Sequence, residues 1–67
     1  MTLKIQVERE ADGRWIADVT QLPGCMVYGK TKADALARAK ALALRVMADR
    51  LEHGESVPVG DELFSVA

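Results

Sequence analysis

The side chains best suited to chemistry in this chain of 67 residues are one cysteine, one histidine and a scatter of carboxylates. Cys25 would be a nucleophile if a base lay beside it, and His53 is the only histidine. We expect His53 at the end of a helix, where its ring meets free carbonyls, and Cys25 as a small apolar residue beside a turn. One cysteine and one histidine also fall short of the four ligands of a zinc site. The sequence predicts no catalytic residue, no metal site and no cofactor.

Carboxylates in sufficient number could hold a pair of metal ions for phosphodiester cleavage. Asp18 is the only acid within the core of an expected strand, and Glu8 lies near the end of another. The acids beside the expected strands lie in a hairpin or just before the last strand: Glu10, Asp12, Asp61 and Glu62. These positions do not converge. The five glycines are scattered at turns and form no phosphate-binding loop, so we expect no enzymatic activity.

Composition indicates one small globular domain over residues 1–67, with 49% hydrophobic and 28% charged residues. A formal net charge of −1, with both signs mixed along the chain, argues against strong electrostatic binding of nucleic acid. No apolar run approaches the roughly 20 residues that span a bilayer. A single cysteine allows no internal disulfide, which favours a reducing, cytoplasmic location.

Three short strands are expected in the first half of the chain. Residues 3–8 alternate apolar and polar side chains, the period of a half-buried strand. Asp12 and Gly13 form a hairpin turn before a second strand at 15–19. Leu22-Pro23-Gly24 breaks that strand before a third at 25–28. Short connections of this kind predict an antiparallel meander.

A long helix is expected from Lys32 to about His53, because this stretch is rich in helix-forming residues and contains no glycine or proline. Thr31 is placed to cap it, Asp34 occupies the acidic position of a capping box, and Gly54 is the expected stop. Two pairs spaced for i,i+4 contact, Asp34–Arg38 and Arg45–Asp49, lie on its polar side.

The apolar stripe of this helix is wider than one sheet requires. We expect the surplus around Leu44, Met47 and Leu51 to mediate self-association as a homodimer or higher homo-oligomer. The alternative is that a very small domain leaves some apolar surface uncovered.

Residues 63–66 are short, apolar and β-prone, and predict a fourth strand that pairs parallel with the first. The expected fold class is therefore α+β with the order βββαβ. The helix covers one face of the sheet, and the other face must be polar or covered by a partner.

Two aromatic residues bear on what that second face does. Trp15 and Tyr28 lie on neighbouring strands, and aromatics on an open sheet can stack nucleic-acid bases, with Lys4 and Lys30 nearby. Trp15 is better explained as core beneath the helix, whereas Tyr28 fits either a stacking surface or a hydrogen-bonded rim.

Three motifs carry a family resemblance. Leu22-Pro23-Gly24-Cys25, then Tyr28-Gly29-Lys30-Thr31, then Asp34-Ala35-Leu36 at the helix start resemble HicB-type antitoxins over most of the chain. The resemblance implies a truncated RNase H-like fold. It also implies a bacterial type II toxin–antitoxin protein that binds and occludes HicA, a small mRNA-cleaving ribonuclease, without catalysis of its own.

The sequence departs from the family pattern at Thr20-Gln21, Lys30 and Ala33, which replace acidic or Pro-Asp positions. Longer relatives add a DNA-binding segment, for which we expect no room here, so operator binding is not expected. On this interpretation the residues expected to contact a partner are Asp18, Gln21, Tyr28 and Lys30.

Two other functions stay open from the sequence. One is a single-stranded RNA-binding module that uses the sheet face. The other is a structural or regulatory homo-oligomer that has lost its toxin.

Overall fold

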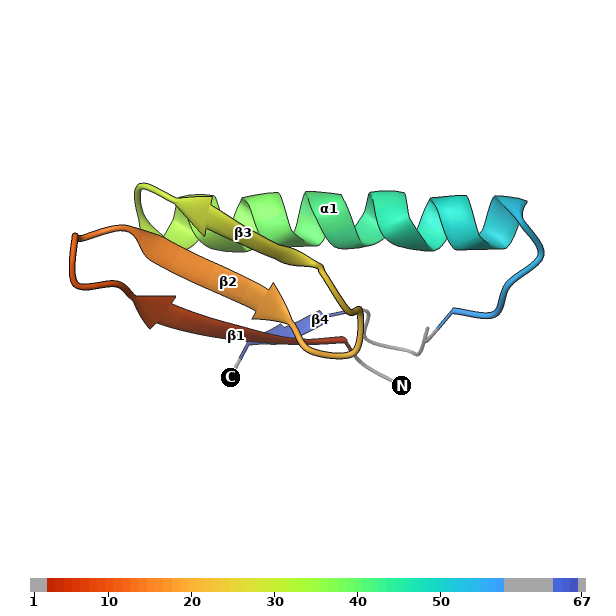
Figure 1. Cartoon of the computed structure of the whole chain (residues 1–67), viewed down its shortest axis with the longest axis horizontal. Coiled ribbons are helices and arrows are strands. Elements are labelled where there is room, and N and C mark those ends of the chain that lie inside the picture. The colour runs from red at the N-terminus through yellow and green to blue at the C-terminus, as the bar shows by residue number, and fades with distance from the viewer. Residues whose placement is uncertain (1–2, 58–63, 67) are drawn as a thin grey trace.

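A computed structural model describes residues 3–57 and 64–66 of the chain (Figure 1). Its sheet has the strand order β3-β2-β1-β4, and one long helix lies across one face of it. In chain order the elements are β1 (Leu3–Arg9), β2 (Trp15–Val19), β3 (Met26–Gly29), α1 (Lys32–Glu52) and β4 (Phe64–Val66).

The predicted α+β fold and its strand pairing are confirmed. β1 pairs antiparallel with β2, β2 pairs antiparallel with β3, and β4 runs parallel to β1. The expected last strand began at Leu63, which lies outside the described residues. Cys25 precedes β3 instead of opening it, because its N–H donates to the Leu22 carbonyl in a turn.

Hydrogen bonds fix both ends of α1. The Thr31 hydroxyl accepts from the Asp34 N–H at 3.0 Å, as the predicted cap requires. The Asp34 carboxylate accepts from the N–H of Lys30 at 3.1 Å. In a capping box it would accept from the N–H of the next residue, Thr31. At the other end, Nδ1 of His53 lies 2.7 Å from the carbonyl of Asp49, so the expected helix-terminal role of His53 is confirmed.

One of the two expected ion pairs on the helix is present. The Nε atom of Arg38 lies 3.2 Å from the Asp34 carboxylate. The second pair is absent among the described residues: the Asp49 carboxylate lies 3.6 Å from Nδ1 of His53 instead of contacting Arg45.

The core lies between α1 and the sheet. α1 contributes mainly alanines and the strands contribute larger aliphatic side chains, so the helix approaches the sheet closely. Gly29 marks the closest approach: a Cβ there would lie 2.7 Å from Cα of Ala35 and closer still to its amide nitrogen. The buried core residues are Leu3, Ile5, Ala17, Val19, Leu22, Cys25, Ala35, Ala39, Ala43 and Met47.

None of the described helical residues form a segment long and apolar enough to cross a membrane.

Candidate partner-binding surface

The face of the sheet opposite α1 has no covering layer among the described residues. Alternation along the strands sends every second side chain to this open face. The register sets six of them in two rows that cross three strands: Gln6, Asp18 and Met26 in one row, and Glu8, Ile16 and Tyr28 in the other. We call these six residues the open face. Lys4 faces the same side at the start of β1, outside these rows.

The open face combines apolar and acidic chemistry. Ile16, Met26 and Tyr28 form its apolar part, and Met26 and Tyr28 are 52% and 42% exposed. Glu8 on β1 and Asp18 on β2 supply two carboxylates. Five of the six residues, all but Tyr28, line a shallow depression of about 170 Å³. Such a surface suits a partner that presents apolar and basic side chains.

Tyr28 is held by an arginine at the border of the open face. The guanidinium carbon of Arg14 lies 4.3 Å from the centre of the Tyr28 ring, within the range of a cation–π contact. Arg14 is itself held by Asp12, whose Oδ2 lies 2.7 Å from its Nε. The Arg14 backbone N–H, followed by its side chain, lowers the pKa of the Asp12 carboxyl below its usual value.

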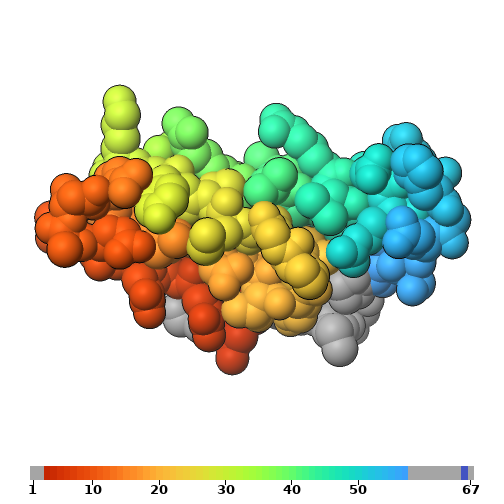
Figure 2. All heavy atoms as spheres, in the orientation of Figure 1, coloured from red at the N-terminus to blue at the C-terminus, as the bar shows by residue number. Residues whose placement is uncertain are grey.

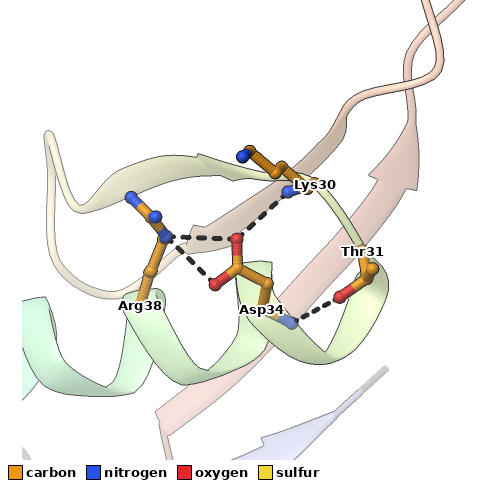
Figure 3. A network of polar contacts seen from close by, with 4 residues as sticks. All are labelled: Lys30, Thr31, Asp34 and Arg38. Carbon is orange, nitrogen blue, oxygen red and sulfur yellow. Dashed lines mark hydrogen bonds and ion pairs between the residues drawn. The ribbon is translucent and has the colours of Figure 1, made fainter.

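The structure separates the four residues expected to contact a partner. Asp18 and Tyr28 lie on the open face, in adjacent rows of adjacent strands. Gln21 lies in the β2–β3 loop, where its Oε1 accepts from the N–H of Lys4 at 3.0 Å and ties the loop to β1. Lys30 follows β3, and its backbone N–H donates to the Asp34 carboxylate at the helix start (Figure 3).

Gln6, Glu8, Ile16 and Met26 complete the open face and were not among the expected contact residues. A signal for them was present in the sequence, since period-2 alternation already assigned Ile16 and Asp18 to one face. What the alternation lacked was the register that aligns them with Met26 and Glu8 across the strands.

Of the residues considered for chemistry, Cys25 has a structural role, and Asp61 and Glu62 lie outside the described residues. Cys25 is 2% exposed, as expected for a small core residue. Burial, and secondarily the charge of Asp18, raises the pKa of its thiol, which disfavours the reactive thiolate. Within residues 3–57 and 64–66, no three His, Cys, Asp or Glu side chains gather as metal ligands would.

One residue of the expected self-association surface is placed elsewhere. Met47 is only 4% exposed and packs in the core against the sheet, so it is not available to a second copy. The helical projection grouped it with its neighbours because the boundary between the core stripe and the surplus cannot be drawn from angles alone. Leu44 and Leu51, at 48% and 60% exposed, lie on the outer side of α1.

These features define a small α+β protein with a four-stranded sheet, one face packed under its own helix and the other open. The chain belongs to the UPF0150 family. It is 36% identical over 59 residues to the UPF0150 protein Ta0767 of Thermoplasma acidophilum, an alignment that covers 87% of this chain and 84% of that relative. No family model matches the chain. No solved structure matches it either.

Proposed function

We propose that this protein is an antitoxin-like binding protein of the HicB type. It binds a small, basic, HicA-type ribonuclease and occludes its active site, and it carries out no catalytic step itself. The observation that carries the proposal is the open face: an uncovered sheet surface in which apolar side chains lie beside Glu8 and Asp18.

The charge of the open face supports a basic partner. A ribonuclease needs cationic groups to bind its RNA substrate, and carboxylates on an inhibitor compete for the same groups. Glu8 lies directly opposite Ile16, and Asp18 lies two residues from Ile16 on the same strand, so basic and apolar contacts would form on one continuous surface. Occlusion of this kind needs shape and charge, and no reactive group.

The HicB resemblance rests on residues that build the fold. Leu22 and Cys25 are buried, and Gly29 and Thr31 set the approach and the cap of α1. The resemblance therefore supports a shared framework, and the recognition of a particular toxin is assigned to the open-face side chains. The departure at Lys30 adds a cation beside the helix start.

The direct test is co-expression with the protein encoded by the neighbouring reading frame. We expect a small basic protein that co-purifies with this chain and whose growth inhibition this chain relieves. Ile16→Arg and Asp18→Lys should each weaken binding by at least tenfold, because a central apolar anchor and a paired carboxylate are lost.

Lys40→Glu is the control, since this exposed residue lies on α1, on the opposite side of the sheet. Unchanged affinity of Ile16→Arg and Asp18→Lys, with the fold intact by circular dichroism, would remove the open face from the proposal.

RNA binding is the second candidate, favoured by the exposed Tyr28 ring with Arg14 against it. The carboxylates of Glu8 and Asp18 on the same face oppose it. A titration of labelled single-stranded RNA at increasing salt separates the two: a steep loss of tight binding indicates an RNA-binding module, and weak binding at every salt concentration supports the antitoxin proposal.

Self-association stays part of the proposal, through the outer side of α1. Leu44 and Leu51 lie seven residues apart and so share one helical face. Sedimentation velocity at micromolar concentration should detect a dimer that Leu44→Lys abolishes, and a strictly monomeric wild-type protein would remove this part.

A further inference from the structure

The edge of the sheet formed by β3 carries a groove separate from the depression on the open face. β3 is the outermost strand on its side, and β3 and α1 run in opposite directions (Figure 1). The groove between them is lined by Met26, Val27 and Tyr28 of β3 and by Arg38, Ala41, Leu42 and Arg45 of α1. Atoms of β3 and α1 border one another on the face shown in Figure 2.

Within residues 3–57 and 64–66, the backbone of β3 has hydrogen-bonding groups along this groove that no other strand pairs with. The N–H of Val19 donates to the Cys25 carbonyl at 2.9 Å, which makes these two residues a hydrogen-bonded pair. Such pairs alternate in an antiparallel ladder, so Val27 bonds to β2, whereas the N–H and carbonyl of Tyr28 point outward. The carbonyl of Met26 points outward as well. An extended chain can therefore add to this edge as a fifth strand.

The side chains of the groove specify what that strand should carry. Its floor is apolar, with Val27 and Leu42 both half-buried. Arg38 and Arg45 lie on α1, seven residues or about 10 Å apart along the helix. The Asp34 carboxylate contacts Arg38, but no carboxylate within the described residues pairs with Arg45. Arg14 and Lys30 add two further cations around Tyr28 and Gly29.

We propose that the β3–α1 groove binds an extended acidic segment of a partner protein by strand addition. Side chains of the added strand that face α1 lie opposite Cys25, Val27 and Gly29. The middle one is apolar and packs over Val27, and the outer two are acidic. These acids are about 13 Å apart, within the combined reach of the Arg38 and Arg45 side chains. The segment has the pattern acid-x-apolar-x-acid.

Charge decides against a second copy of this chain as the occupant. If two β3 edges paired antiparallel about a two-fold axis, both helices would lie on the same side of the joined sheet. Arg38 and Arg45 of one copy would then lie close to Arg38 and Arg45 of the other copy. These like charges would repel one another. An acidic strand meets the same arginines with favourable charge and leaves the open face free.

The experiment uses the full chain and a labelled peptide, acetyl-SETLTES-amide, with binding measured by fluorescence anisotropy and by NMR shifts of the Tyr28 and Met26 amides. We expect saturable binding that Arg38→Glu/Arg45→Glu weakens at least tenfold. Arg9→Glu/Lys40→Glu, which makes the same change in net charge outside the groove, should leave binding unchanged. Arg45→Gln keeps the Asp34–Arg38 pair and should give a smaller loss, which covers the case in which the double variant does not fold.

Two altered peptides complete the test. The lysine version, acetyl-SKTLTKS-amide, should not bind. N-methylation of both threonines should abolish antiparallel strand addition, because it removes the N–H groups that face the carbonyls of Met26 and Tyr28. The proposal is overturned by equal binding of either altered peptide, by no binding of the parent, or by unchanged affinity of both arginine variants.

Displacement of the peptide by single-stranded RNA of higher affinity would assign the groove to nucleic acid, and a dimer that the peptide dissociates would assign it to a second copy. Either result also overturns the proposal, and neither bears on the toxin binding proposed for the open face.

Discussion

The two faces of the sheet are built from the same strands and differ in almost every property. On the covered face, Leu3, Ile5, Ala17 and Val19 have no exposed surface. On the open face, the side chains between them, such as Gln6 and Asp18, are exposed or half-buried. One residue of offset along the chain separates the two environments, because side chains alternate across a strand.

The difference shows how a protein this small divides its apolar residues. Alanines at 35, 39 and 43 let α1 approach the sheet closely, so a modest number of aliphatic residues fills the core. Ile16, Met26 and Tyr28 are then left for the second face, where they add little to the fold and are free to contact another molecule. Stability and binding are expected to depend on different residues of the same strands.

The strongest test of this division replaces isoleucine by alanine on each face. Ile5→Ala removes a fully buried side chain and should lower the free energy of unfolding by about 3 kcal/mol. Ile16→Ala removes a half-buried side chain on the adjacent strand and should cost about 1 kcal/mol or less. Urea unfolding followed by the fluorescence of Trp15 measures both.

Toxin binding should show the reverse order, with Ile16→Ala the weaker binder and Ile5→Ala, where folded, close to wild type. Equal destabilisation by the two substitutions would mean that the open face contributes to the fold as the covered face does.

The end of β3 extends the comparison to a residue without a side chain. Gly29→Ala should destabilise the protein by about 2 kcal/mol, because the added methyl meets the Ala35 backbone and α1 must move. Gly24→Ala is the matched control: its φ of +82° strains any other residue, but nothing lies near the added methyl, and a cost of about 1 kcal/mol is expected.

Thermal unfolding ranks the two glycine variants. A smaller loss of stability for Gly29→Ala than for Gly24→Ala would show that α1 can shift without cost. Close packing of the covered face would then not be required for stability.

The sequence was sufficient to predict the elements and their pairing, since alternation, turn residues and helix-forming composition all indicated the same fold. The Asp12-Gly13 turn, the Thr31 cap and the parallel fourth strand were each predicted. Met47 was misplaced because a helical projection gives angles and no depth, and the width of the core stripe depends on how closely α1 lies to the sheet. Alanine spacing and Gly29 determine that distance.

The candidate surface was only partly predictable. Asp18 and Tyr28 lie on the open face, where their contact with a partner stays a prediction, whereas Gln21 contacts Lys4 from the β2–β3 loop. The groove beside β3 was not predicted, because Arg38 and Arg45 were assigned only to the polar side of a helix. Their proximity to the unpaired edge depends on the antiparallel crossing of α1 and β3, which the composition of neither element reveals.

The contacts between the end of β3 and the start of α1, which we call the junction, predict a stability that depends on pH. The Lys30 N–H, followed by the Arg38 side chain, lowers the pKa of the Asp34 carboxyl below its usual value (Figure 3). Because the folded-state pKa is depressed, this contribution to stability is present above about pH 4 and is lost as the pH falls through the folded value. The stability difference between wild type and Asp34→Asn should therefore shrink in acid.

Thr31→Ala is the control for this effect. It should cost about 1 kcal/mol by removing the hydroxyl that accepts from the Asp34 N–H, and this loss should vary little with pH. A difference for Asp34→Asn that stays constant down to acidic pH would show that the carboxylate charge does not stabilise the junction.

The smallest expected effect concerns the contact between Arg14 and Tyr28 at the border of the open face. Arg14 lies over Tyr28 in exposed surroundings, where a cation–π contact contributes about 0.5 kcal/mol. A double-mutant cycle with Arg14→Gln and Tyr28→Leu isolates that coupling from the other effects of each change. A coupling free energy well above 1 kcal/mol would show that Tyr28 of the open face contributes to the stability of the fold. That residue would then not be free to serve a partner alone, and the division between the two faces would fail at Tyr28.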